Sequence, residues 1–103
     1  METSRTSRGF SIAKFKDRYG NVCSLQKSSL ATEDCIWLGV DDADPRVMAV
    51  EAARFGICAD KVTGWVPYPI PECVGLTTRM HLSREQVADL LPHLQKFVAT
   101  GEL

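Results

Sequence analysis

Basic and hydroxyl-bearing side chains gather in two stretches of the sequence, where together they could bind an anion. These residues are Lys27, Ser28, Ser29, Arg79, His81 and Arg84. The second stretch surrounds the start of a predicted helix, which offers free amide groups and the positive end of its dipole. Arginine can add two parallel charge-assisted bonds to a phosphate. The pattern predicts a pocket that binds an anion. The alternative is an ordinary polar sheet face in which Arg79 pairs with a carboxylate.

Three aromatic residues could complete such a pocket by stacking on a base. Trp65 and Tyr68 lie on a connector with alternate prolines at 67, 69 and 71, which exclude a helix interior or a central strand. Rings on a stiff extended segment could stack on a base or dock on a partner, or could pack over the core. Tyr19 lies in a predicted turn. The predicted ligand-binding set is therefore Arg79, Arg84, His81, Lys27, Ser28, Ser29, Trp65, Tyr68 and Tyr19.

Catalytic and metal-binding patterns are weak in this sequence. The only histidines are His81 and His93, and neither has a context that marks a serine or cysteine nucleophile. The four cysteines are far apart and form no CxxC pair, which argues against a zinc site, and Cys23 and Cys35 are expected to be buried. The acidic residues at 41–44 could bind a cation, but a solvated loop with Asp44 as a helix cap is favoured. We expect no catalytic residue, metal or cofactor.

The last 28 residues specify the elements that position these side chains. Leu76 to Leu82 alternates as a half-buried strand, with Arg79 and His81 on its polar face. From Ser83 the apolar residues recur with a helical period at positions 87, 90, 91, 94, 97 and 98. Ser83 and Gln86 form a capping box, and Gly101 ends the pattern. We predict a principal helix from Ser83 to about residue 99 that lies across the sheet.

The preceding chain supplies the rest of the predicted sheet. Residues 10–16 and 22–30 form a hairpin around the turn at 17–21, and Ser24, Gln26 and Ser28 share one face of its second strand. Residues 36–40 form a strand in the middle of the sheet. A second, shorter helix is predicted from Asp44-Pro45 to Gly56. The expected fold is α+β: a flexible tail over residues 1–9, then a single domain over 10–103, a small mostly antiparallel sheet with both helices on one face.

Composition limits the classes of partner. The chain has 103 residues, with 12 Lys and Arg against 13 Asp and Glu, so no overall positive field favours general nucleic-acid binding. No signal peptide or long apolar run is visible, which predicts a cytoplasmic protein with free thiols rather than a membrane protein. A domain this small, with exposed rings and strand edges, is expected to form a homo-oligomer.

Four stretches, at residues 15–20, 23–31, 36–39 and 79–86, together resemble a class of small phage- and prophage-encoded proteins. The resemblance implies a protein that acts on host machinery in the host cytoplasm, and it transfers no ligand residue. Two kinds of that size are nucleotide-signal sponges of the Thoeris anti-defence kind and anti-CRISPR proteins. We therefore expect a non-enzymatic module that sequesters a cyclic nucleotide or a cyclic ADP-ribose-like signal. The alternative is an inhibitor that docks on a host defence complex through Trp65, Tyr68 and the acidic residues 41–44.

Overall fold

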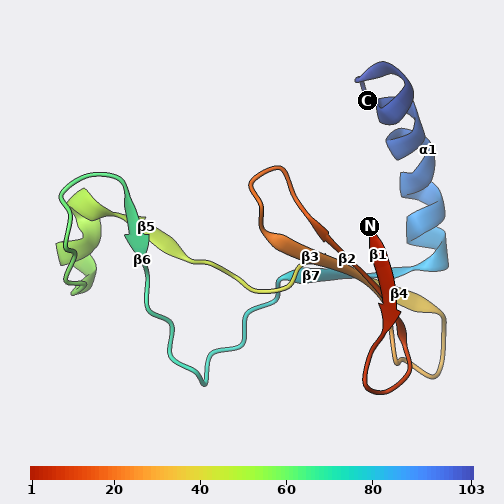
Figure 1. Ribbon diagram of the computed structural model, residues 1–103, viewed down its shortest axis with the longest axis horizontal. Coiled ribbons are helices and arrows are strands. Elements are labelled where there is room, and N and C mark those ends of the chain that lie inside the picture. Colours follow the sequence, from red (N-terminus) through yellow and green to blue (C-terminus); the bar gives the residue numbers. More distant parts are fainter. The chain divides into compact units, whose positions relative to one another are not determined.

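The computed structural model describes residues 1–103 and has the predicted α+β class (Figure 1). Its elements are the strands β1 (Glu2–Arg5), β2 (Ser11–Lys16), β3 (Val22–Lys27), β4 (Cys35–Val40), β5 (Arg46–Met48), β6 (Trp65–Pro67) and β7 (Arg79–Ser83), the 3₁₀ helix η1 (Ala49–Phe55) and the helix α1 (Arg84–Thr100). Where the sequence predicted one domain over residues 10–103, the chain divides into two compact units. Unit 1 comprises residues 1–41 and 78–103, and unit 2 comprises residues 42–77.

Unit 1 contains a five-stranded sheet in the order β1-β2-β3-β4-β7, in which every neighbouring pair is antiparallel. The predicted hairpin is present as β2 and β3. Its turn is held by the Asp17 carboxylate, which accepts hydrogen bonds from the amides of Tyr19 and Asn21, and by Gly20 at φ 86°. The predicted strand at 36–40 is β4, an interior strand between β3 and β7.

The N-terminal residues form a strand, so the prediction of a flexible tail over residues 1–9 is wrong. β1 pairs with β2 from Glu2 opposite Lys14 to Arg5 opposite Ser11. The chain reverses at Gly9, where φ is 86°, and the Thr6 amide donates to the Phe10 carbonyl at 2.7 Å. The tail was predicted to fray because it lacks apolar side chains. Backbone pairing with the free edge of β2 does not require them.

The helix α1 begins and ends as the sequence predicted. Ser83 Oγ accepts from the Gln86 amide at 3.2 Å while the Ser83 amide donates to Gln86 Oε1 at 2.9 Å, which completes the capping box. Gly101 ends the helix in the left-handed conformation, and Pro92 lies inside it. The preceding strand is shorter than predicted, since residues 76–78 lie outside β7.

The predicted packing of this helix across the sheet is not found, because no residue of α1 is buried. Among the strands, α1 contacts mainly β7. The physical reason is the junction: Ser83 is both the last residue of β7 and the cap of α1. No loop remains that could turn the helix back over the strands. The apolar side chains of α1 are therefore exposed in the single chain.

Unit 2 differs from the predicted helix at residues 44–56. Residues 46–48 form β5, which pairs with β6, and the helix is the shorter 3₁₀ helix η1. Asp44 does not cap it, because its carboxylate pairs with Arg46, and Met48 occupies the cap position. Val47 lies opposite Val66, and burial of these two side chains with Ala52 outweighs the local helical pattern. Gly56 ends the helix as predicted, at φ 71°.

Candidate functional site

One face of the unit 1 sheet carries polar side chains from β2, β3 and β7 together with Trp37 from β4, and is called here the polar face. Its members are Lys14, Ser24, Gln26, Ser28, Trp37, Arg79 and His81. The register explains this grouping, since residues directly opposite each other in a sheet point to the same side. Trp37 lies opposite Gln26 on one neighbour and opposite His81 on the other.

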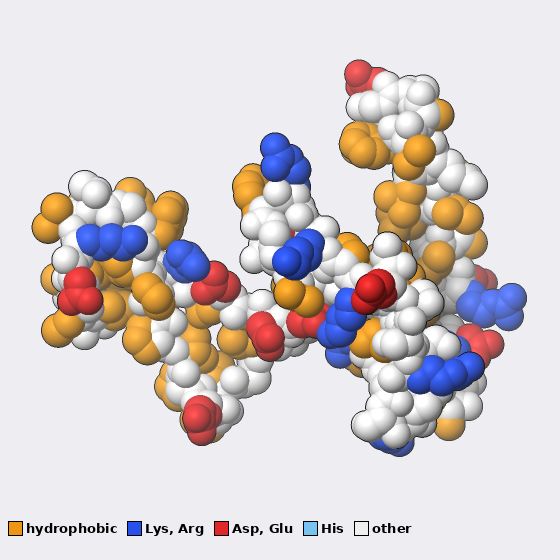
Figure 2. Space-filling view, viewed as in Figure 1, with side chains coloured by type: hydrophobic (Ala, Val, Ile, Leu, Met, Phe, Trp, Pro, Cys, Tyr) orange, Lys and Arg blue, Asp and Glu red, His pale blue; other side chains and the backbone are white.

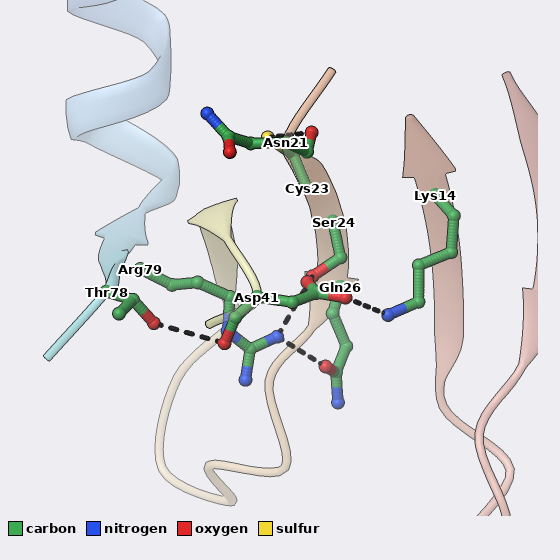
Figure 3. Close-up of polar contacts among 8 residues, drawn as sticks. All are labelled: Lys14, Asn21, Cys23, Ser24, Gln26, Asp41, Thr78 and Arg79. Atoms are coloured by element: carbon green, nitrogen blue, oxygen red, sulfur yellow. Dashed lines mark hydrogen bonds and ion pairs between the residues drawn. The ribbon is translucent and has the colours of Figure 1, made fainter. Parts of the chain in front are cut away.

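Arg79 lies on the edge strand β7, reaches across β4 to β3 and forms hydrogen bonds only with neutral groups. Its Nη1 donates to Gln26 Oε1 at 2.7 Å and to Ser24 Oγ at 3.3 Å (Figure 3). The guanidinium carbon lies 5.6 Å from the centre of the Trp37 ring, at the distance of a cation–π contact. None of the four ion pairs in the structure includes Arg79. The direct ion pair between Arg79 and a carboxylate, which was part of the alternative prediction, is therefore not found.

Gly39 makes room for Arg79 to reach across β4 to β3. A Cβ atom on Gly39 would lie 2.7 Å from the Thr78 carbonyl oxygen and 3.0 Å from the Arg79 Cα. It would also lie 3.5 Å from the Arg79 Cγ, and φ at Gly39 is 151°. Any side chain at this position would displace the backbone of β7. The glycine thus keeps β4 and β7 close enough for Arg79 to reach Ser24 and Gln26.

Asp41 closes a hydrogen-bonded chain beside Arg79. Its carboxylate accepts from the ammonium group of Lys14 and, at 2.6 Å, from Ser24 Oγ. These bonds hold the pKa of Asp41 below its ordinary value, against the opposite effect of burial. Thr78 Oγ1 donates to the Asp41 backbone oxygen at 3.4 Å (Figure 3). The negative charge of Asp41 is thus paired directly with Lys14, while Arg79 lowers the pKa of Asp41 from a longer distance and forms no direct ion pair.

His81 forms the aromatic part of the polar face together with Trp37. The two rings are stacked, with centroids 4.0 Å apart and an angle of 15° between planes. His81 Nε2 lies 2.9 Å from Ser28 Oγ, which also accepts the Leu30 amide at 3.1 Å. Ser28 is buried, whereas His81 is exposed. The exposed ring, fixed by the stack and the hydrogen bond, lies beside Arg79 on the same strand.

The structure brings three predicted site residues together on the polar face: Arg79, His81 and Ser28. The other predicted site residues of unit 1 lie elsewhere. Lys27 points to the opposite face of the sheet, where it lies across from Ile36 and pairs with Asp34. Arg84 lines a groove with Lys27 rather than with the polar face. Ser29 is exposed in the loop after β3, and Tyr19 is 90% exposed at the tip of the hairpin.

The two predicted aromatic residues of the connector belong to unit 2 and not to the polar face. Tyr68 is half-buried against Val47, Ala52 and Val66, with its ring edge-on to Phe55 at 6.0 Å. Packing on the core, which was the alternative interpretation, describes Tyr68 correctly. Trp65 is 55% exposed and lies opposite Met48 in the two-stranded sheet.

Sequence reasoning missed several residues of the polar face, and partial signals for them existed. Ser24 and Gln26 were placed on one face with Ser28, but their partner on β7 was not identified. Trp37 was interpreted as part of a continuous apolar run, in which no alternation distinguishes the two faces. Asp41 was considered only with the acidic residues 41–44, as a possible cation ligand or docking surface, and not with Arg79. The strand register, which sequence alone does not provide, brings these residues to Arg79.

Three further searches assign no additional function to the chain: for metal sites, for membrane-spanning helices and for known relatives. No group of three or more His, Cys, Asp or Glu side chains is arranged to hold a metal ion. Neither helix has the length and apolar character needed to cross a membrane. Comparisons with protein-family models, with curated proteins and with solved structures found no match to this chain.

Proposed function

We propose that this chain is a non-enzymatic module that binds and sequesters a small anionic nucleotide-like ligand on the polar face of unit 1. The observation that carries the proposal is the state of Arg79. Its guanidinium is half-buried, is fixed by Gln26 and Ser24 and lies against the Trp37 ring, and it forms no direct ion pair, although its charge helps to lower the pKa of the neighbouring Asp41. A guanidinium that is fixed in advance by neutral hydrogen-bond partners favours an anion, because charge-assisted bonds then form at little entropic cost.

The remaining donors and the nearby rings match the two chemical parts of a nucleotide. Both hydrogen bonds of Arg79 come from Nη1, so the N–H groups of Nη2 and Nε remain available to donate to phosphate oxygens. The stacked rings of Trp37 and His81 lie on the same face. An additional ring stacked on an aromatic side chain contributes about 1–3 kcal/mol. We infer that the phosphate binds to Arg79 and that the base lies against the rings of Trp37 and His81.

The contacts of the polar face favour binding over catalysis. Ser28 and His81 form the only serine–histidine pair there, but Ser28 is buried and its Oγ already accepts the Leu30 amide. No carboxylate is hydrogen-bonded to His81, so no third group would orient the ring as a base. Asp41 is engaged by Lys14 and Ser24. We therefore propose a stoichiometric binder, in keeping with the sponge role that the resemblance implies.

A second candidate function, an inhibitor that docks on a host protein, is favoured by one observation in unit 2. Trp65 and Met48 lie opposite each other and are both exposed, as is Phe55. Exposed large side chains of this kind are common at the centre of protein interfaces. The acidic part of the proposed surface is weaker, because Asp44 is paired with Arg46 and Asp41 with Lys14.

The experiment that separates these functions is a calorimetric screen of the purified protein. Cyclic dinucleotides, cyclic trinucleotides and cyclic ADP-ribose isomers are titrated, and the bound compound is recovered by heat denaturation. Recovery of the unaltered compound is the expected result. A chemically altered product would indicate an enzyme, and the absence of heat with every compound would contradict nucleotide binding. A stoichiometric host protein recovered by pull-down in that last case would support the inhibitor function.

A further inference from the structure

Unit 1 has two apolar surfaces whose side chains are not buried in the single chain. The first is the sheet face opposite the polar face, called here the apolar face, formed by Phe15, Leu25, Ile36, Leu38, Val40, Met80 and Leu82. Met80 is 53% exposed and the other six side chains are half-buried, so none of the seven is fully buried. The second is the apolar stripe of α1, formed by Val87, Leu90, Leu91, Leu94, Phe97 and Val98. Figure 2 shows apolar side chains along α1, where Leu94 is 47% and Phe97 54% exposed.

The solvent-accessible surface area of the chain is larger than that of compact folded proteins of the same size. The chain has 8408 Å² of accessible surface. Two separate compact proteins with the sizes of units 1 and 2 would together expose only about 6,900 Å². The excess, about 1,500 Å², exceeds the roughly 800 Å² that each partner buries in a standard interface. The chain therefore exposes enough surface for a stable interface.

The two uncovered surfaces match each other in size and chemistry. The stripe from Val87 to Val98 is about 17 Å long at 1.5 Å per residue. Four strands at about 4.8 Å spacing, each about 20 Å long, form a sheet face of similar extent. A helix on a sheet is one of the standard two-layer arrangements of a domain core. One chain thus carries both layers of a core that it does not assemble itself.

The junction at Ser83 explains why the two layers do not meet within one chain. β7 runs into α1 with no intervening loop, so only the first turns of the helix approach the sheet. Between them lies an open groove lined by Ile36, Leu82, Val87 and Leu91, with Lys27 and Arg84 at its edge. An identical molecule related by a two-fold axis could cover both surfaces of each chain at once.

We propose that unit 1 is completed by a second copy of this chain, with α1 of each copy packed on the apolar face of the other. This inference goes beyond ligand binding, because it concerns the face of the sheet opposite Arg79. Leu94 and Phe97 of one copy contact Leu25, Leu38 and Met80 of its partner. The apolar groove receives the remaining residues of the partner helix. The polar face stays open on the outer side of each sheet.

Light scattering of the full-length protein at micromolar concentration tests the assembly. The wild type is expected at twice the 11.4 kDa mass of one chain, or at an even multiple of it. Leu94→Glu should give the single-chain mass, and the matched control Gln95→Glu, one residue along and off the stripe, should keep the wild-type mass. A wild type at 11.4 kDa, or a Leu94→Glu variant with unchanged mass, would overturn the proposal.

A second measurement shows which copy supplies the helix. It uses only the wild type, so it does not depend on whether a variant folds. Isotope-labelled and unlabelled chains are mixed, and filtered nuclear Overhauser spectra are recorded without any ligand. We expect contacts between copies from the Phe97 ring and Leu94 methyls to Leu25, Leu38 and Met80. Contacts found only within one chain would mean that α1 folds back on its own sheet, and the exchange proposal would be rejected. Neither measurement involves the polar face, so failure here leaves nucleotide binding to its own test.

Discussion

At the scale of single residues, the arrangement of the polar face depends on a glycine that contacts no ligand in our proposal. Gly39→Ala would place a Cβ 2.7 Å from the Thr78 carbonyl oxygen. We expect a loss of about 1–3 kcal/mol in the free energy of unfolding, because β7 must move away from β4. Urea unfolding measures this change. Gly75→Ala is the matched control, since a Cβ there meets nothing within 4 Å and its φ is not positive; equal losses in both variants would refute the steric explanation.

The carboxylate of Asp41 predicts how stability changes in acid. Its hydrogen bonds with Lys14 and Ser24 lower its pKa in the folded state, so it contributes stability above the unfolded pKa of about 3.9. That contribution is lost as the pH falls through the folded value. Asp41→Asn should therefore be less stable than the wild type at pH 7, by about 1 kcal/mol.

Thermal or urea unfolding across the acid range measures the Asp41 effect. The difference between wild type and Asp41→Asn should shrink as the pH falls from 6 toward 3. Asp42→Asn is the control, because Asp42 is exposed and makes no ion pair. A difference between wild type and Asp41→Asn that stays constant over this range would show that the charge of Asp41 does not stabilise the fold.

At the scale of elements, the capping box of α1 is the clearest local determinant. Ser83→Ala removes the acceptor for the Gln86 amide and should cost about 1 kcal/mol in the free energy of unfolding. Gln86→Ala removes the reciprocal bond to the Ser83 amide. Because the two bonds support the same turn, the double variant should lose less than the sum of the single losses. Additive losses would mean that the two bonds act independently.

Local signals predicted the elements whose causes lie within a few residues. The Asp17–Asn21 turn, the interior strand β4, the cap at Ser83 and the helix end at Gly101 were all identified from sequence. The predicted helix at 44–56 failed because pairing of β5 with β6 is a non-local effect. The N-terminal strand failed for the same reason, since its partner β2 supplies backbone hydrogen bonds that composition does not reveal.

The candidate site was only partly predictable, and strand alternation explains which part. Arg79, His81 and Ser28 have alternate positions that point to one face, and they do meet. Lys27 was included as the basic residue of the stretch with Ser28 and Ser29, although adjacent residues of a strand point to opposite faces. Trp37 could be placed on the polar face only from the register of β4 against β7.

At the scale of the whole molecule, the two units differ in how their cores are built. Unit 2 has a small closed core of Val47, Ala52 and Val66, whereas no large apolar side chain of unit 1 is fully buried. Val66→Ala should destabilise unit 2 by about 1–3 kcal/mol. Hydrogen exchange should show faster exchange in β5, η1 and β6 and unchanged exchange in β2, β3 and β4. Equal acceleration in both units would mean that they unfold as one.

The central claim is that Arg79 on the polar face binds the anionic part of a nucleotide-like ligand, and one comparison of dissociation constants tests it most directly. For a compound found by the calorimetric screen, the constant is measured with the wild type, Arg79→Ala and Arg84→Ala. Loss of charge-assisted bonds worth about 1.5–3 kcal/mol should weaken binding at least tenfold in Arg79→Ala. Arg84→Ala should bind like the wild type, because Arg84 lines the groove with Lys27 and Ile36. A folded Arg79→Ala protein that binds as tightly as the wild type would contradict the claim.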